Sequence, residues 1–272
     1  MKARANKPIS NLLELENISF VRNGKKIIDG LSLQILKGES WAILGKNGSG
    51  KTTLLNIIYG LTWPTTGSVK IFGKEFGDFP IREIQKKIGI LQSSHQEERI
   101  QKNLSVKEII ATGFFSSIGL YSKITRLQKS QIGKILKDHG LEKKLNENFS
   151  NLSSGEKKLV LLLRSIISNP EILILDEPLS SFDISAREKF SAILKKLRTK
   201  KKFTLLLVTH RVEEIPDFIT HAALMKNGKI LAKGKIGEVL TNENLSKTYS
   251  IGLEVIHSKG RFSLFPSNRN IR

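Results

Sequence analysis

Residues 45–52 have the composition and spacing of a loop that binds phosphate. With the residue that follows, the loop reads Gly45-Lys46-Asn47-Gly48-Ser49-Gly50-Lys51-Thr52-Thr53 and fits the pattern G-x-x-x-x-G-K-[ST]. The glycines let backbone N–H groups turn inward around phosphate oxygens, and a following helix presents its positive end to the same anion. In this pattern Lys51 neutralises phosphate charge and the Thr52 hydroxyl ligates Mg²⁺. The loop therefore predicts a nucleotide site that uses Mg²⁺.

A pair of carboxylates forms a second candidate site. The apolar stretch Ile172–Leu175 is followed directly by Asp176 and Glu177. Acids at the carboxyl edge of a sheet lie beside bound phosphate. Asp176 suits coordination of Mg²⁺, directly or through water, and Glu177 suits a general base that polarises the attacking water. Without the phosphate loop, the same pattern would be equally typical of a strand that leaves the core.

A third candidate precedes a strongly apolar helix. It reads Leu152-Ser153-Ser154-Gly155-Glu156. Ser153 or Ser154 can cap the helix, and an acid in the first turn suits the helix dipole. A helix N-terminus with hydroxyls and a glycine that permits close approach is also a second anion site. One chain thus carries two phosphate-binding halves.

These candidates require strands and helices that position them. Leu12–Phe20 and Leu31–Ile35 alternate in hydrophobicity and predict an antiparallel edge. Trp41–Leu44 predicts a strand before the phosphate loop, and Lys51–Tyr59 predicts the helix after it. Further strand candidates, several nearly all apolar as in a parallel sheet buried on both faces, are Ser68–Phe72, Ile88–Leu91, Glu171–Leu175 and Phe203–Thr209.

Between residues 93 and 168 the sequence pattern changes from strands to helices. Helices are expected at Val106–Thr112, Leu127–His139 and Gly155–Ile167, and short ones at Ile236–Leu240 and near Leu245. The fold class is therefore α/β: a P-loop NTPase core with a mixed, mainly parallel sheet, an N-terminal antiparallel edge and an inserted helical subdomain at about residues 93–168. We expect a flexible tail at 1–10, the main domain at 11–250 and a partly flexible C-terminal extension at 251–272.

Composition excludes several classes of protein. The 272 residues contain no cysteine, which removes disulfides, thiolate catalysis and cysteine-based zinc sites. No apolar run approaches the ~20 residues of a membrane helix, and no secretory signal is evident, so we expect a cytoplasmic protein. The net charge of +20 could attract nucleic acid, but 33 of the 45 basic residues are lysines spread along the chain, which favours a solvated surface.

The motifs taken together resemble those of ATP-binding cassette (ABC) ATPases. In sequence order they are the phosphate loop 45–53, Gln92 after a strand, Leu152–Glu156, Leu175–Pro178, Ser180–Asp183 and Thr209-His210. The resemblance covers roughly Leu12 to Phe262. It implies ATP hydrolysis in a head-to-tail dimer, where the segment at 152–156 of one cassette closes on the γ-phosphate held by another.

The same resemblance implies roles for single residues. Gln92 is similar to the glutamine that senses Mg²⁺ and the attacking water and communicates with a transmembrane partner. His210 is similar to the switch histidine that contacts the γ-phosphate, and Asp183 to the aspartate that crosses the dimer interface, although alone it would be a helix cap. Where many members stack an aromatic residue on adenine, this chain has Arg22. A guanidinium can also stack on a base, so base selectivity is left open.

The chain departs from the family's usual motif at two positions, and it resembles one bacterial subgroup more closely. The family's usual L-S-G-G-Q has Ser154 and Glu156 in place of a glycine and the glutamine, substitutions that the family tolerates. The segments Trp41–Gly45, Gly113–Tyr121 and Glu213–Pro216 are similar to a bacterial molybdate-type (ModF-like) subgroup.

The resemblance implies a homodimer that energises separate membrane permease subunits from the cytoplasmic face of the inner or plasma membrane. Two alternatives stay open: a stand-alone ABC ATPase that acts on nucleic acid or a protein, and a catalytically silent regulator.

Overall fold

The computed structural model describes residues 11–92, 103–180 and 182–267. Its centre is a sheet in the order β10-β9-β3-β8-β7-β6, in which all pairs are parallel except β9 with β10. The strands, in chain order, are β3 (Ser40–Leu44), β6 (Ile88–Gln92), β7 (Ile172–Asp176), β8 (Thr204–Thr209), β9 (His221–Lys226) and β10 (Lys229–Lys235). The flexible tail predicted at residues 1–10 lies outside the described residues.

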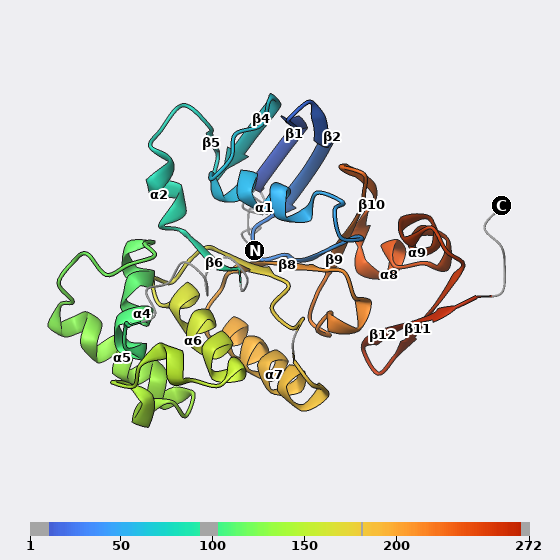
Figure 1. Ribbon diagram of the computed structural model, residues 1–272. Coiled ribbons are helices and arrows are strands. Elements are labelled where there is room, and N and C mark those ends of the chain that lie inside the picture. Colours follow the sequence, from blue (N-terminus) through green and yellow to red (C-terminus); the bar gives the residue numbers. More distant parts are fainter. Residues whose placement is uncertain (1–10, 93–102, 181, 268–272) are drawn as a thin grey trace, which may run out of the picture.

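A second, antiparallel sheet has the order β2-β1-β4-β5. It is built from β1 (Asn11–Arg22), β2 (Lys25–Leu36), β4 (Thr66–Ile71) and β5 (Lys74–Glu75). Helix α1 (Lys51–Tyr59) lies between the two sheets (Figure 1). Its Leu54, Leu55, Ile57 and Ile58 are fully buried in one apolar core with residues of both sheets.

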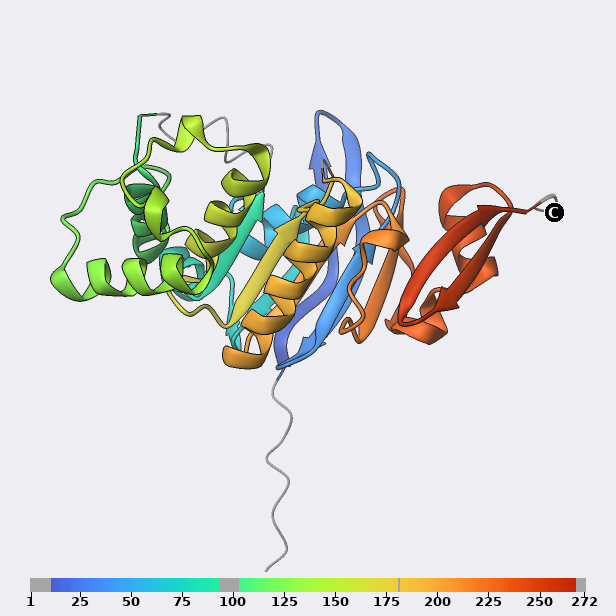
Figure 2. The same ribbon diagram turned by 90° about the horizontal axis from the view of Figure 1, so that it is seen from below.

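The other face of the central sheet is covered by helices α6 (Ser154–Ile166) and α7 (Ile184–Lys200), which Figure 2 shows side by side. The strands are apolar on both faces because each face packs on a different core. In β8, Leu205 and Leu207 pack toward these helices, whereas Leu206 and Val208 pack toward α1. Such continuous apolar runs are typical of parallel strands that are covered on both sides.

The chain between β6 and β7 forms a helical region at one side of the molecule (Figure 1). It contains α4 (Val106–Thr112), the 3₁₀ turn η1 (Gly113–Phe115), α5 (Arg126–Asp138), η2 (Glu142–Lys144), η3 (Phe149–Asn151) and α6. Buried Arg164 of α6 holds the turn after α4, since it donates to Thr112 Oγ1 at 2.7 Å and to the Ser117 carbonyl at 2.8 Å. Between β5 and β6 the chain forms the short helix α2 (Ile81–Gln85).

The remaining elements follow β8. They are η4 (Val212–Glu214), α8 (Ile236–Val239), α9 (Asn242–Tyr249) and a hairpin of β11 (Leu253–Ser258) with β12 (Arg261–Pro266). Within the described residues, no helix combines the length and apolar character needed to cross a bilayer. The predicted fold class is confirmed: a mainly parallel central sheet, an antiparallel N-terminal sheet and a helical insertion.

Strand register brings the predicted site residues to one edge. Gln92 of β6 is level with Asp176 of β7, Asp176 with Val208 of β8, and Leu44 of β3 with Thr209. The phosphate loop, Glu177 and His210 each follow directly after one of these strand ends. The carboxyl ends of parallel strands are the usual position of ligand sites in such folds.

Candidate functional site

The phosphate loop turns sharply between β3 and α1, and two glycines make the turn possible. Gly50 has φ of 102°, and a Cβ added there would lie 2.9 Å from the carbonyl oxygen of Ile27. A Cβ on Gly45 would lie 2.3 Å from the Met225 carbonyl oxygen. A side chain at either position would collide with neighbouring backbone, so the loop needs glycine for both its conformation and its close packing.

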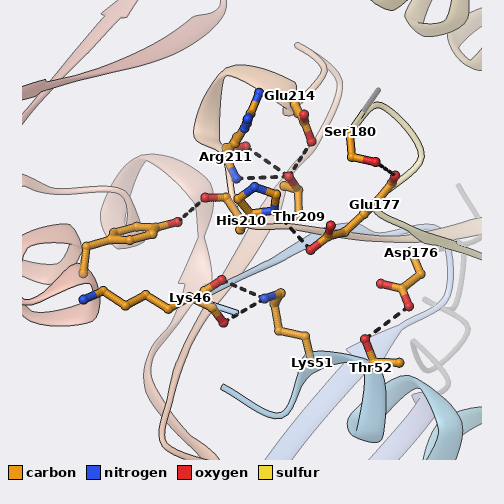
Figure 3. Close-up of polar contacts among 12 residues, drawn as sticks. Lys46, Lys51, Thr52, Asp176, Glu177, Ser180, Thr209, His210, Arg211 and Glu214 are labelled. Atoms are coloured by element: carbon orange, nitrogen blue, oxygen red, sulfur yellow. Dashed lines mark hydrogen bonds and ion pairs between the residues drawn. The ribbon is translucent and has the colours of Figure 1, made fainter. Parts of the chain in front are cut away.

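Lys51 begins α1 and points back over the loop. It is 5% exposed, and its ammonium donates to the carbonyls of Gly45 at 2.7 Å and Lys46 at 3.0 Å (Figure 3). Burial lowers the pKa of Lys51, while the negative charges of Glu177 and Asp176 act in the opposite direction. The loop thus presents a desolvated cation beside two carboxylates.

Asp176 ends β7 and faces the start of α1. Its Oδ2 accepts a hydrogen bond from the Thr52 hydroxyl at 3.3 Å, and Gln92 also hydrogen-bonds to it. Burial, and next the charge of Glu177, raise the pKa of Asp176 to about 6, although Thr52, Lys51 and Gln92 favour its ionised form. Gln92 is buried and also donates to Asn56 Oδ1 at 3.2 Å. Sequence reasoning had not identified Asn56.

The raised pKa of Asp176 predicts a stability cost that depends on pH. The folded carboxyl holds its proton up to about pH 6, whereas the ordinary pKa is 3.8. The folded state binds this proton more tightly than the unfolded state, which adds to the free energy of unfolding at low pH. This contribution is lost as the pH rises through the folded pKa. We expect Asp176→Asn to melt above the natural chain at about pH 8, with the difference shrinking toward about pH 4. Melting temperatures across this range test it.

Exposed Asp78 offers a matched control for that measurement. Asp78→Asn should melt like the natural chain at each pH, because a solvated carboxyl has little to gain from neutralisation. A difference between Asp176→Asn and the natural chain that stays constant with pH would contradict the assignment of the cost to ionisation.

Glu177 occupies a strained backbone conformation next to Asp176. Its φ is 47°, in the left-handed region that residues other than glycine seldom adopt. The conformation is held because the Glu177 N–H donates to the Val208 carbonyl at 2.9 Å and the Ser180 hydroxyl donates to the Glu177 carbonyl at 3.1 Å. Strain of this kind clusters at active sites. At Glu177 this conformation lets its carboxylate point toward His210, while the carboxylate of Asp176 points toward Thr52 (Figure 3).

His210 reaches Glu177 from the end of β8. Its Nδ1 lies 3.1 Å from Glu177 Oε1 (Figure 3). The preceding residue, Thr209, donates from its hydroxyl to Glu214 Oε2 at 2.6 Å. The histidine and the carboxylate come from residues 33 apart in sequence, and the strand ends bring them together as the sequence indicates.

The phosphate loop and the two carboxylates border an open pocket of about 520 Å³. It is lined by Ile27, Asn47, Gly48, Gly50, Lys51, Thr52, Thr53, Asp176, Glu177 and Ser180. The volume suits a small organic ligand. Sequence reasoning did not assign Ile27 or Ser180 to the site. Ser180 lies in a quoted motif, but Ile27 carries no signal until β2 packs over the phosphate loop.

The other predicted site residues do not line this pocket. Arg22 is exposed at the end of β1. Ser153 caps α6 in a capping box: its hydroxyl accepts from the Glu156 N–H at 3.3 Å, and the Glu156 carboxylate accepts from the Ser153 N–H at 2.9 Å. These bonds lower the pKa of Glu156. Exposed Asp183 caps α7, since its Oδ1 accepts from the Ala186 N–H at 2.7 Å.

Comparison with known proteins shows which family the chain resembles. Residues 28–180 match the family model described as ABC transporter. A putative ABC transporter ATP-binding protein of Streptococcus mutans is 37% identical, with 90% of this chain and 94% of that protein covered. An uncharacterized ABC transporter ATP-binding protein of Lactococcus lactis, YmeB, is 33% identical, with 94% and 99% covered. The zinc uptake system ATP-binding protein ZurA of Listeria monocytogenes is 30% identical, with 85% and 88% covered.

Solved structures agree with these relatives. A dimeric ATP-binding cassette in a post-hydrolysis state with ADP and phosphate has a TM-score of 0.71 and 26% identity, with 82% of this chain and 98% of that chain covered. A putative metal-chelate type ABC transporter in an inward-facing conformation has a TM-score of 0.77, with 96% and 99% covered. At 23% identity, the second likeness concerns the fold alone.

Proposed function

Because the chain belongs to the ABC transporter family and is an ATP-binding, ATP-hydrolysing cassette of it, we propose that two copies of it enclose two Mg·ATP head to tail. The observation that carries this proposal is the separation of the two predicted phosphate-binding halves. Residues 153–156 do not line the pocket formed by the phosphate loop of their own chain. Their exposed helix N-terminus would meet the γ-phosphate held by the partner copy.

The donor set beside the phosphate loop fits Mg²⁺. The Thr52 hydroxyl, the Asp176 carboxylate and the Gln92 amide meet at one strand edge, and Mg²⁺ prefers oxygen ligands and usually retains several waters. When bound, the ion would neutralise charge on the β- and γ-phosphates. Lys51 and the loop N–H groups, from Gly45 to Thr53, would hold the phosphates from the other side.

We propose that Glu177 acts as the general base of hydrolysis. Its carboxylate would take a proton from the attacking water while the water oxygen bonds to the γ-phosphorus and the bond to the leaving ADP oxygen breaks. His210, at 3.1 Å from this carboxylate, would orient it and contact the γ-phosphate. We also propose that Asp183 lies at the dimer interface and that Arg22 stacks on the adenine base.

We further propose that the helical region docks on a separate membrane-spanning permease, which would bring the chain to the cytoplasmic face of the membrane. Three large hydrophobic side chains within residues 118–127 support this: Ile118 is 41%, Tyr121 82% and Leu127 69% exposed. Exposed apolar side chains of this kind mark interaction sites. Phe114 instead packs against the core.

A photocrosslinking amino acid in place of Tyr121 tests this docking. In membranes of the source cells we expect ultraviolet light to join the chain to an integral membrane protein, because Tyr121 projects from the helical region. The same residue in place of Phe265, which is 49% exposed on the C-terminal hairpin, serves as the control. Equal crosslinking from both positions, or only to water-soluble proteins from Tyr121, would contradict the proposal.

Two resemblances concern the cargo. The zinc uptake protein among the relatives is compatible with transport of a metal ion or metal complex, and the molybdate-type resemblance points to an oxyanion. Since the cassette's pocket is occupied by nucleotide in this mechanism, we propose that the membrane partner selects the cargo.

A further inference from the structure

The end of the chain contacts the residues around His210. We define the C-terminal unit as residues 242–266, which comprise α9, β11 and β12. This unit lies beyond residue 180, where the match to the family model ends. The hydroxyl of Tyr249, the last residue of α9, donates to the carbonyl oxygen of His210 at 2.8 Å. The peptide that carries the histidine is therefore held by the C-terminal unit.

Tyr249 is suited to remain a hydrogen-bond donor. Burial raises the pKa of Tyr249 to about 12, and the negative charge of Glu213 adds to the shift. The phenol thus stays protonated throughout the neutral range. A carbonyl such as that of His210 can only accept, so the direction of this bond is fixed.

A second contact holds the same peptide from the opposite side. Glu214 is 2% exposed, and its Oε2 accepts from the Thr209 hydroxyl at 2.6 Å. The Thr209 hydroxyl oxygen in turn accepts from the Arg211 N–H at 3.1 Å (Figure 3). The residues on both sides of His210 are thereby tied to η4, while Tyr249 holds the carbonyl of His210 itself.

The hairpin of the C-terminal unit reaches two further elements. The Leu264 N–H donates to Glu213 Oε1 of η4 at 3.2 Å. Arg261 forms a two-pronged ion pair with Glu188 of α7, the helix that Asp183 caps. The unit therefore touches both the segment that follows His210 and the helix that follows Asp183.

We propose that Tyr249 of the C-terminal unit is a positioning residue for His210 in ATP hydrolysis. This inference rests on the proposed role of His210. Without the phenol, the His210 carbonyl loses its donor, and the peptide is freer to rotate and to draw Nδ1 away from Glu177. Neither Tyr249 nor His210 lines the nucleotide pocket, so the change affects turnover more than ATP binding.

Tyr249→Phe tests the inference because it removes the hydroxyl and keeps the ring. We expect kcat for ATP hydrolysis to fall about fivefold, the size of one ordinary hydrogen bond, while KM for ATP stays within about twofold. Ser258→Ala, which removes an exposed hydroxyl from β11 of the same C-terminal unit, is the control and should leave kcat unchanged. An unchanged kcat in Tyr249→Phe overturns the inference.

His210→Ala separates this inference from the proposed function. In single-turnover assays with protein in excess over ATP, His210→Ala should hydrolyse ATP slowly, and adding Tyr249→Phe should slow it no further, because both changes act through one side chain. If Tyr249→Phe costs the same factor without His210, the tyrosine acts elsewhere and the inference is wrong. If His210→Ala alone hydrolyses ATP at the natural rate, the proposed role of His210 is wrong instead.

Discussion

Glu177→Gln protein should hydrolyse ATP at least about 100-fold more slowly than the natural chain, because a general base contributes about that much or more. The amide cannot take the proton of the attacking water. It can still accept a hydrogen bond, and it removes one negative charge beside Lys51 and Asp176. ATP binding should therefore persist, and the protein should accumulate as an ATP-bound dimer. Phosphate release and light scattering during size-exclusion chromatography measure the two effects.

A control variant shows whether this result concerns the site. Glu83→Gln makes the same chemical change at an exposed surface pair with Lys74, 3.6 Å away, and should leave phosphate release unchanged. Phosphate release from Glu177→Gln within about twofold of the natural rate would contradict its role as base.

The same trapped dimer reports on the head-to-tail arrangement. Ser154 is exposed at the start of α6, beside the capping residue Ser153. Adding Ser154→Arg to Glu177→Gln should block the ATP-dependent dimer and leave binding of ATP to the monomer intact, because the pocket does not include Ser154. A dimer that forms as well with Ser154→Arg would exclude the proposed contact across the interface.

Strands and helices could be predicted from the sequence where their residue composition matches their position in the fold. Ile172–Leu175 and Leu205–Val208 are apolar on both faces because each strand serves two cores. The helices Lys51–Tyr59 and Val106–Thr112 have the predicted bounds. Once the strands are parallel and level, the residues after them must meet at one edge. The strand ends bring Gln92, Asp176, Glu177 and His210 together, whereas in the sequence only the resemblance to ABC ATPases singled out Gln92 and His210.

Other features depend on contacts that the chain forms only after folding. Strand β9 contains Ala222 and Ala223, which have low β propensity, and it exists because β3 pairs with it. The positive φ of Glu177 arises from backbone bonds to Val208 and Ser180. Neither has a local signature, so neither could be predicted from the sequence around it.

The C-terminal hairpin has a turn signal in its sequence, Lys259-Gly260. Residues 253–258 and 261–266 pair in register around a turn, Lys259-Gly260, where both residues have positive φ. The frequent Ser, Asn and Arg residues of this segment instead favour a partly flexible extension. Only the structure reveals that this hairpin contacts Glu213, close to His210, and Glu188 of α7.

Lys51→Met should give the second large effect, and it should do so without weakening the fold. Methionine keeps an unbranched stem of similar length but removes the ammonium that, in the proposed function, holds the phosphates. Removing one such donor from a preorganised site typically lowers kcat by about 10²–10³-fold, and ATP affinity should fall as well. Phosphate release and calorimetric titration with ATP measure these losses. Lys137→Met, at an exposed lysine of α5, is the matched control.

The stability of Lys51→Met distinguishes a lost site from a lost fold. Burial lowers the pKa of Lys51, which means that its charged form opposes folding at neutral pH. The two loop carbonyls that it contacts lose a donor on substitution, which partly offsets the gain from removing a buried cation. We therefore expect a melting temperature at or slightly above that of the natural chain, together with the loss of hydrolysis. A protein that melts far lower would show that Lys51 acts mainly as a structural residue, and retained hydrolysis would exclude it from phosphate binding.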